Sequence, residues 1–164
     1  MTFSRTVAVL FAAAIAGCAS PDRQPLASPP HEVPAAALNP DVRQDTIHQT
    51  ICVPGYTATV RPASSFTNGV KLKLMRDAGI SQADAGFYEL DHRVALAVGG
   101  HPRALVNLAL QKWDGEAGAK RKDNLERRLQ LLVCSDRMPL REAQSALYFD
   151  WQAAYLKYRG RPTN

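Results

Sequence analysis

Residues 88–100 read YELDHRVALAVGG, and they place Asp91 and His92 side by side in a run that is otherwise apolar and typical of a strand. Successive side chains of a strand point to opposite faces, so this pair cannot face one core together. Burying a charged or polar side chain without partners is costly in free energy. The pair therefore indicates a functional site within a strand.

The first 17 residues have the pattern of a secretory signal peptide. Their only charge is Arg5, and an apolar run from Val7 to Ala16 follows it. That run is too short for a membrane-spanning helix, which needs about 20 residues. Residues 15–18, IAGC, resemble the lipobox of bacterial lipoproteins, in which cleavage leaves the cysteine as a lipid-modified N-terminus. We expect lipidation of Cys18, with ordinary cleavage after Ala16 as the alternative.

The chain has three cysteines, an odd number for a protein of an oxidising compartment. If Cys18 carries a lipid, Cys52 and Cys134 remain as a pair. We expect a disulfide between these two. The mature chain is then expected in the cell envelope, held to a membrane by its lipid and facing the periplasm or the cell exterior.

Residues 18–45 are predicted to be an extended tether. Six prolines lie between Pro21 and Pro40, and large apolar residues are few. Such a stretch cannot bury enough surface to offset the entropy lost on ordering. The folded domain is predicted to span residues 46–164. The formal charge of the chain is +5, and removing residues 1–17 takes away only Arg5 and leaves +4, a mild excess compatible with a polyanionic partner.

The folded part is predicted to be α+β. Residues 46–61 are rich in β-branched side chains and are expected to form one or two short strands. Residues 66–79 are expected to form a helix that Gly79 ends. Two strand arms are predicted at 87–97 and 105–110, with a turn at Gly99 and Gly100 between them. Amphipathic helices are predicted at 116–133 and 139–158.

The order Asp-His, Gly-Gly, Asn-Leu and then a basic helix resembles the HNH endonuclease motif. The segments TICVPGYTATVRP, SSFTN, KRKDNLERRL, LLVCS and DWQAAYLKY are also similar to a group of secreted bacterial HNH-type proteins, so the resemblance covers residues 46–158. It implies a ββα-metal finger, a small β-hairpin followed by a helix, packed with additional helices and short N-terminal strands.

The resemblance also implies a role for each motif residue. His92 matches the general base, Asp91 a ligand of a divalent metal ion, and Asn107 the residue that ties the hairpin loop and helps to orient the histidine. Mg²⁺ is the expected cofactor, because it binds through one or two carboxylates and keeps several waters. One position departs from the pattern. The helix residue that usually supplies another ligand falls at Gly118, or at Ala119, and neither side chain can bind a metal.

The predicted helix that follows carries five basic residues close to the motif. They are predicted to contact nucleic-acid phosphates, which adds affinity without sequence readout, and they are Lys120, Arg121, Lys122, Arg127 and Arg128. The alternative is a solvated helix surface on which Lys122 and Glu126 form an i,i+4 pair.

The resemblance implies a metal-dependent endonuclease that hydrolyses nucleic-acid phosphodiester bonds with little sequence specificity. We expect DNA to be favoured over RNA as the substrate, and the chain to be a monomer. The alternative is a non-catalytic envelope lipoprotein that keeps a degenerate finger as a structural or nucleic-acid-binding scaffold. The glycine at position 118 favours this alternative.

Overall fold

The computed structural model describes residues 32–159 of the chain, and it has the α+β class that the sequence predicts. In the described part, four α-helices and one two-stranded antiparallel sheet form the fold. The helices are α1 (Tyr56–Val60), α2 (Ser64–Asp77), α3 (Ala119–Cys134) and α4 (Leu140–Tyr158), and the strands are β1 (Tyr88–His92) and β2 (Leu108–Lys112). Short 3₁₀ helices lie at Ala35–Ala37, Gln44–Gln49, Gln82–Phe87, Leu96–Val98 and Leu105–Asn107.

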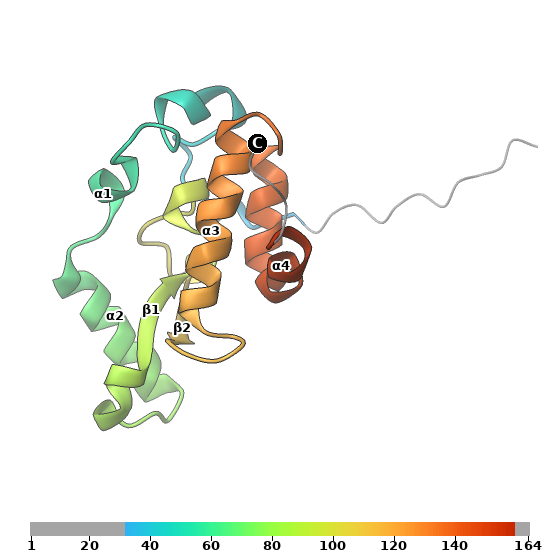
Figure 1. The fold of residues 1–164 in the computed structure, drawn as a ribbon. Helices are drawn as coiled ribbons and strands as arrows, with labels where there is room; N and C mark the ends of the chain where they lie inside the picture. The colour runs from blue at the N-terminus through green and yellow to red at the C-terminus, as the bar shows by residue number, and fades with distance from the viewer. Residues whose placement is uncertain (1–31, 160–164) are drawn as a thin grey trace, which may run out of the picture.

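The β1–β2 hairpin lies between α2 and α3, and α4 packs against α3 (Figure 1). Helix α3 forms because Leu125, Leu129 and Leu132 recur at helical spacing and bury one face of the helix in the core that α4 shares. Helix α4 is interrupted at Asp150, whose backbone is not helical. The Asp150 carboxylate accepts a hydrogen bond from the Ala153 N–H at 2.9 Å and so caps the second part of the helix.

The hairpin is shorter than the sequence predicts. Strand β1 ends at His92, which pairs with Leu108, so the expected arm to residue 97 is wrong beyond His92. Residues 96–98 instead form a 3₁₀ turn that ends at Gly99. Gly99 has a φ of +81°, and a Cβ at Gly100 would lie 1.8 Å from the Val94 carbonyl oxygen. The two glycines therefore allow the tight return that the sequence predicts, because no larger residue fits there.

The short N-terminal strands predicted for residues 46–61 are wrong. This segment contains a 3₁₀ helix and α1, separated by a turn at Gly55 with a φ of +85°. Its β-branched side chains do not alternate between a buried and an exposed face, and Ile47 and Ile51 are buried four residues apart, as on one side of a helical turn. Composition alone therefore misled the prediction.

The folded part begins before residue 46, where the predicted tether was expected to end. Val33, Ala37 and Val42 are buried in the core. The Asn39 N–H donates to the Gly99 carbonyl at 2.8 Å, and the His101 N–H donates to the Ala37 carbonyl at 2.8 Å. Residues 33–42 are thus part of the fold. The predicted signal peptide and Cys18 lie outside the described residues.

The predicted disulfide between Cys52 and Cys134 is confirmed in the structure, with the two Cα atoms 5.5 Å apart. It joins the segment before α1 to the last residue of α3, and both cysteines pack against the core. Within residues 32–159, no helix is both long and apolar enough to cross a membrane.

Candidate functional site

Asp91 and His92 line two different cavities. His92 lines a cavity of 450 Å³ beside α2, whereas Asp91 lines a cavity of 510 Å³ beside α3 and α4. This separation follows from the alternation of side chains along β1. Asp91 and His92 therefore do not face one common cavity.

The His92 side chain is held in one tautomer by the chain around it. His92 is 8% exposed, and its Nε2 lies 3.0 Å from the carbonyl oxygen of Pro102. Because a carbonyl oxygen only accepts hydrogen bonds, Nε2 carries the hydrogen, and the Nδ1 lone pair of the neutral ring is left as an acceptor. Burial lowers the pKa of His92 from its ordinary value, so the ring is neutral at neutral pH. A neutral imidazole with a defined acceptor nitrogen is suited to act as a base.

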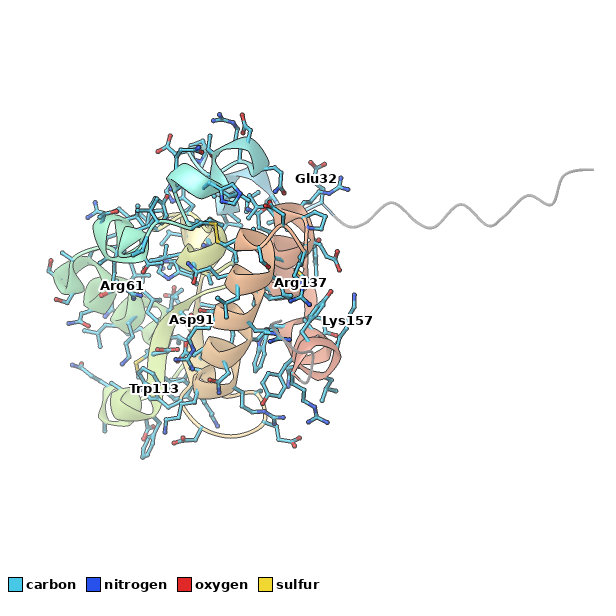
Figure 2. All side chains as sticks on the ribbon, turned by 45° about the horizontal axis from the view of Figure 1, so that its top comes forward. Glu32, Arg61, Asp91, Trp113, Arg137 and Lys157 are labelled. Atoms are coloured by element: carbon cyan, nitrogen blue, oxygen red, sulfur yellow. A yellow bond between two sulfur atoms is a disulfide. The ribbon has the colours of Figure 1, made fainter. Side chains whose placement is uncertain are left out.

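The cavity around His92 is lined by basic and polar side chains from α2 and from the link that precedes it, and by the acidic side chain of Glu89 on β1. Arg61 directly follows α1 and lies on the α2 side of the molecule (Figure 2). Lys71 lies on α2 and donates to the Ala85 carbonyl at 2.8 Å. The cavity is also lined by Ser64, Thr67, Asn68 and Trp113. No motif in the sequence singles out Arg61, because its place in the cavity depends on how the segment before α2 packs against β1.

Asp91 lies on β1 beside α3 (Figure 2), and its carboxylate is fully engaged by the chain. Its Oδ1 accepts the His92 backbone N–H at 2.7 Å, and its Oδ2 lies 2.8 Å from the Nζ of Lys122. Lys122 also donates to the His92 carbonyl at 2.8 Å and to Glu126 on its own helix. The Lys122 side chain is 2% exposed, so this ammonium group is buried among its three acceptors.

Burial and charge act against each other in this cluster. Burial disfavours the charged form of Lys122, but the carboxylates of Glu126 and Asp91 outweigh it and raise the Lys122 pKa, so the amine stays protonated. Burial raises the pKa of Glu126 to about 7, against the attraction of Lys122. Burial and then the Asp91 charge raise the pKa of Glu89 on β1 to about 7 as well. The positive charge of Lys122 thus partly offsets the mutual repulsion of the carboxylates around it.

The residues around Asp91 do not fit a divalent metal ion. Among the described residues, no group of three or more His, Cys, Asp or Glu side chains could hold one. Gly118 cannot be replaced by a ligand in this backbone, because a Cβ there would lie 2.7 Å from the Trp113 carbonyl oxygen. The α3 residue that meets Asp91 is Lys122, one turn after Gly118. Position 118, at which the resemblance places a ligand, therefore lies one turn before the α3 residue that contacts Asp91.

Asn107 directly precedes β2 and is fully buried beneath the loop that joins β1 to β2. Its Oδ1 accepts the Val94 N–H at 2.8 Å, and its Nδ2 donates to the carbonyls of Val94 at 3.1 Å and His101 at 3.0 Å. These bonds tie the loop that carries Pro102, the partner of His92. The ring of His101 accepts the backbone N–H groups of residues 103 and 104 and so shapes the same loop.

The five basic residues of α3 do not form one surface. Lys122 is buried, so its predicted contact with phosphates is wrong, and its pair with Glu126 is the i,i+4 pair weighed as the alternative. Lys120 is exposed and lies 2.6 Å from Asp114, and Arg127 is exposed. Arg121 lies over the Tyr155 ring. Two guanidinium nitrogens of Arg128 are buried without a hydrogen-bond partner among the described residues.

Compared with known proteins, the chain matches no family model, no curated protein and no solved structure. Its function is therefore inferred from the residues around β1 themselves.

Proposed function

We propose that this protein hydrolyses phosphodiester bonds in nucleic acid, DNA more than RNA, in the cavity that His92 lines. The observation that carries the proposal is the state of His92. Its ring is neutral, its Nε2 hydrogen is bound by the Pro102 carbonyl, and its Nδ1 lone pair is left to accept a proton. We propose that the β1–β2 hairpin and α3 form a ββα finger like that of the HNH endonucleases.

The residues of the cavity supply two parts of the reaction. His92 Nδ1 takes a proton from water while the water oxygen attacks the phosphorus. The bond to the leaving oxygen breaks, and that oxygen takes a proton from solvent. Arg61 and Lys71 line the same cavity and place positive charge near the phosphate, where negative charge develops in the transition state. No residue lining the cavity suggests recognition of particular bases, so we expect little sequence specificity.

A second candidate is a non-catalytic scaffold that binds nucleic acid or serves only as structure. The observation that favours it is Gly118, which lies where the HNH pattern is expected to supply a metal ligand and where a Cβ would lie 2.7 Å from the Trp113 carbonyl oxygen. The sequence-based expectation of a Mg²⁺-dependent enzyme is not supported by the donor atoms around Asp91, and the mechanism above includes no metal.

The test compares the oxidised wild-type protein with His92→Ala on supercoiled plasmid and on single-stranded RNA. Reactions contain EDTA or one of Mg²⁺, Mn²⁺, Ni²⁺ and Zn²⁺. Loss of the base is expected to slow cleavage by about 10²–10⁴-fold. His48→Ala is the matched control, because His48 is exposed and does not line the cavity. Equal cleavage by wild type and His92→Ala refutes the mechanism, and intact nucleic acid under every condition supports the scaffold.

We also propose that the chain is exported and held to a membrane of the cell envelope by a lipid on Cys18. The disulfide between Cys52 and Cys134 supports export, because such bonds persist in oxidising compartments. Cys18→Ser is expected to move the protein from the membrane fraction to the soluble fraction. Mass spectrometry of the N-terminus then identifies the lipid or its absence, and an unmodified Cys18 in the wild type contradicts the proposal.

A further inference from the structure

We infer that Lys122 is an internal cation that takes the place of a divalent metal ion between β1 and α3. In this view Lys122 is a positioning residue, which fixes Asp91 and the backbone at His92, and the site takes up no divalent ion of its own. The inference concerns cation binding and stands whether or not the protein is a nuclease. Its consequence for cleavage rests on the proposed function.

The first argument is the geometry of the ammonium group. An ammonium has three N–H donors, and Lys122 has three acceptors at hand: Asp91 Oδ2 at 2.8 Å, the His92 carbonyl at 2.8 Å and Glu126 Oε1. Two acceptors come from β1 and one from α3. The lysine therefore joins the same two elements that a metal ion would join in a ββα finger.

The second argument is the nature of the acceptors. Two carboxylates and a backbone carbonyl are hard oxygen ligands of the kind that Mg²⁺, Mn²⁺ and Ca²⁺ prefer. Here each of them already binds a positive charge, and the lysine that carries it is buried along its length. A metal ion could bind only after the ammonium group had left a site in which its side chain is 2% exposed. Such a movement would strand a charge in the interior or open the packing of α3.

The third argument is the link from Lys122 to the proposed base. Lys122 holds the carbonyl of His92, whereas Pro102 holds the ring of the same residue. The backbone and the side chain of His92 are therefore fixed by separate partners. Asp91 adds a third restraint, since its Oδ1 binds the His92 N–H. Lys122 thus secures the end of β1 without contacting the cavity in which His92 lies.

The test measures Mn²⁺ binding by electron paramagnetic resonance, with wild type, Asp91→Asn, Lys122→His and the double variant Lys122→His/Asp91→Asn. Wild type and Asp91→Asn are expected to leave the same concentration of free Mn²⁺. Lys122→His is expected to bind about one Mn²⁺ per chain, because an imidazole then joins the two carboxylates. The double variant should lose that ion. Lys120→His is the matched control, since Lys120 is exposed on the same helix, and it should gain no ion.

One Mn²⁺ bound by wild type and lost in Asp91→Asn overturns the inference, and this arm does not depend on the folding of any lysine variant. A folded Lys122→His protein that gains no ion also overturns it, because the carboxylates would then not form a cation position. If the protein is a nuclease, wild-type cleavage should persist in EDTA. Absence of cleavage under all conditions refutes the proposed function and leaves the Mn²⁺ result to decide the inference.

Discussion

Replacing Asn107 by alanine is expected to destabilise the fold more than any surface change, because Asn107 is 0% exposed and makes three hydrogen bonds to backbone. The substitution removes the acceptor of the Val94 N–H and the donor to two carbonyls. A buried group left unsatisfied costs about 1–3 kcal/mol, and carbonyls, which have two lone pairs, fall at the lower end. The three unsatisfied groups together are therefore expected to lower the free energy of unfolding by roughly 4 kcal/mol.

Urea denaturation followed by tryptophan fluorescence measures this loss, since the chain has 2 tryptophans. A change of about 4 kcal/mol lowers the melting temperature of a domain of this size by roughly 10–20 °C. A loss below about 1 kcal/mol would show that water or a rearranged loop satisfies the freed backbone groups. In that case the loop is not held by Asn107, and the placement of Pro102 against His92 needs another cause.

Asn107→Asp refines the prediction through its pH dependence. A carboxylate keeps the acceptor for Val94 but turns its second oxygen toward two carbonyls, which repel it. The folded state therefore raises the pKa of this carboxyl above its unfolded value of about 3.9. The protonated form is favoured in the folded state, so the deficit relative to wild type is smallest below about pH 3.9 and grows as the pH rises. Asn107→Ala, which does not titrate, is the control, and parallel pH profiles for the two variants would contradict the assignment.

Three further changes test the fold. Cys52→Ala/Cys134→Ala should lower the free energy of unfolding by roughly 4–5 kcal/mol in the chain-entropy treatment of a bridge with a sequence separation of 82. The reduced wild type should unfold at the same urea concentration as this double variant. Gly100→Ala should destabilise by several kcal/mol or prevent folding, because its Cβ would lie 1.8 Å from a backbone oxygen. Gly69→Ala, within α2 and with open space around it, should instead stabilise the protein by about 0.5–1 kcal/mol. Equal effects of the two glycine changes in thermal melts would show that the close approach at Gly100 is not a restraint.

The α+β class, the hairpin around Asp91 and the two long C-terminal helices can be predicted from the sequence, because periodic burial and paired glycines are local signals. The disulfide follows from counting cysteines. The segment from residue 46 to 61 cannot be predicted in the same way. Its β-branched residues favour strands, but burial of Ile47 and Ile51 by distant parts of the chain decides its shape.

The sequence predicts which residues belong to the candidate site, but it does not predict which of them contact one another. The sequence indicates Asp91, His92 and Asn107, and it shows that Gly118 cannot be a ligand. It does not show that Lys122 faces β1. Which turn of α3 meets the strand depends on the path of residues 113–118, and a shift of one turn changes the partner from a glycine to a lysine. The role of Arg61 depends on a contact between segments far apart in the chain.

The bridge between Leu38 and Gly100 has a consequence for how the protein can be shortened. Residues 37–39 cover backbone groups of residues 99–101, which would otherwise form an open edge. A protein cut at residue 42 would expose the Gly99 carbonyl and the His101 N–H, and such unpaired edges bind the edges of other chains. Residues 37–39 therefore cover this edge as a built-in part of the fold, and a fragment that begins no later than Val33 keeps the edge paired and the buried Val33 in the core.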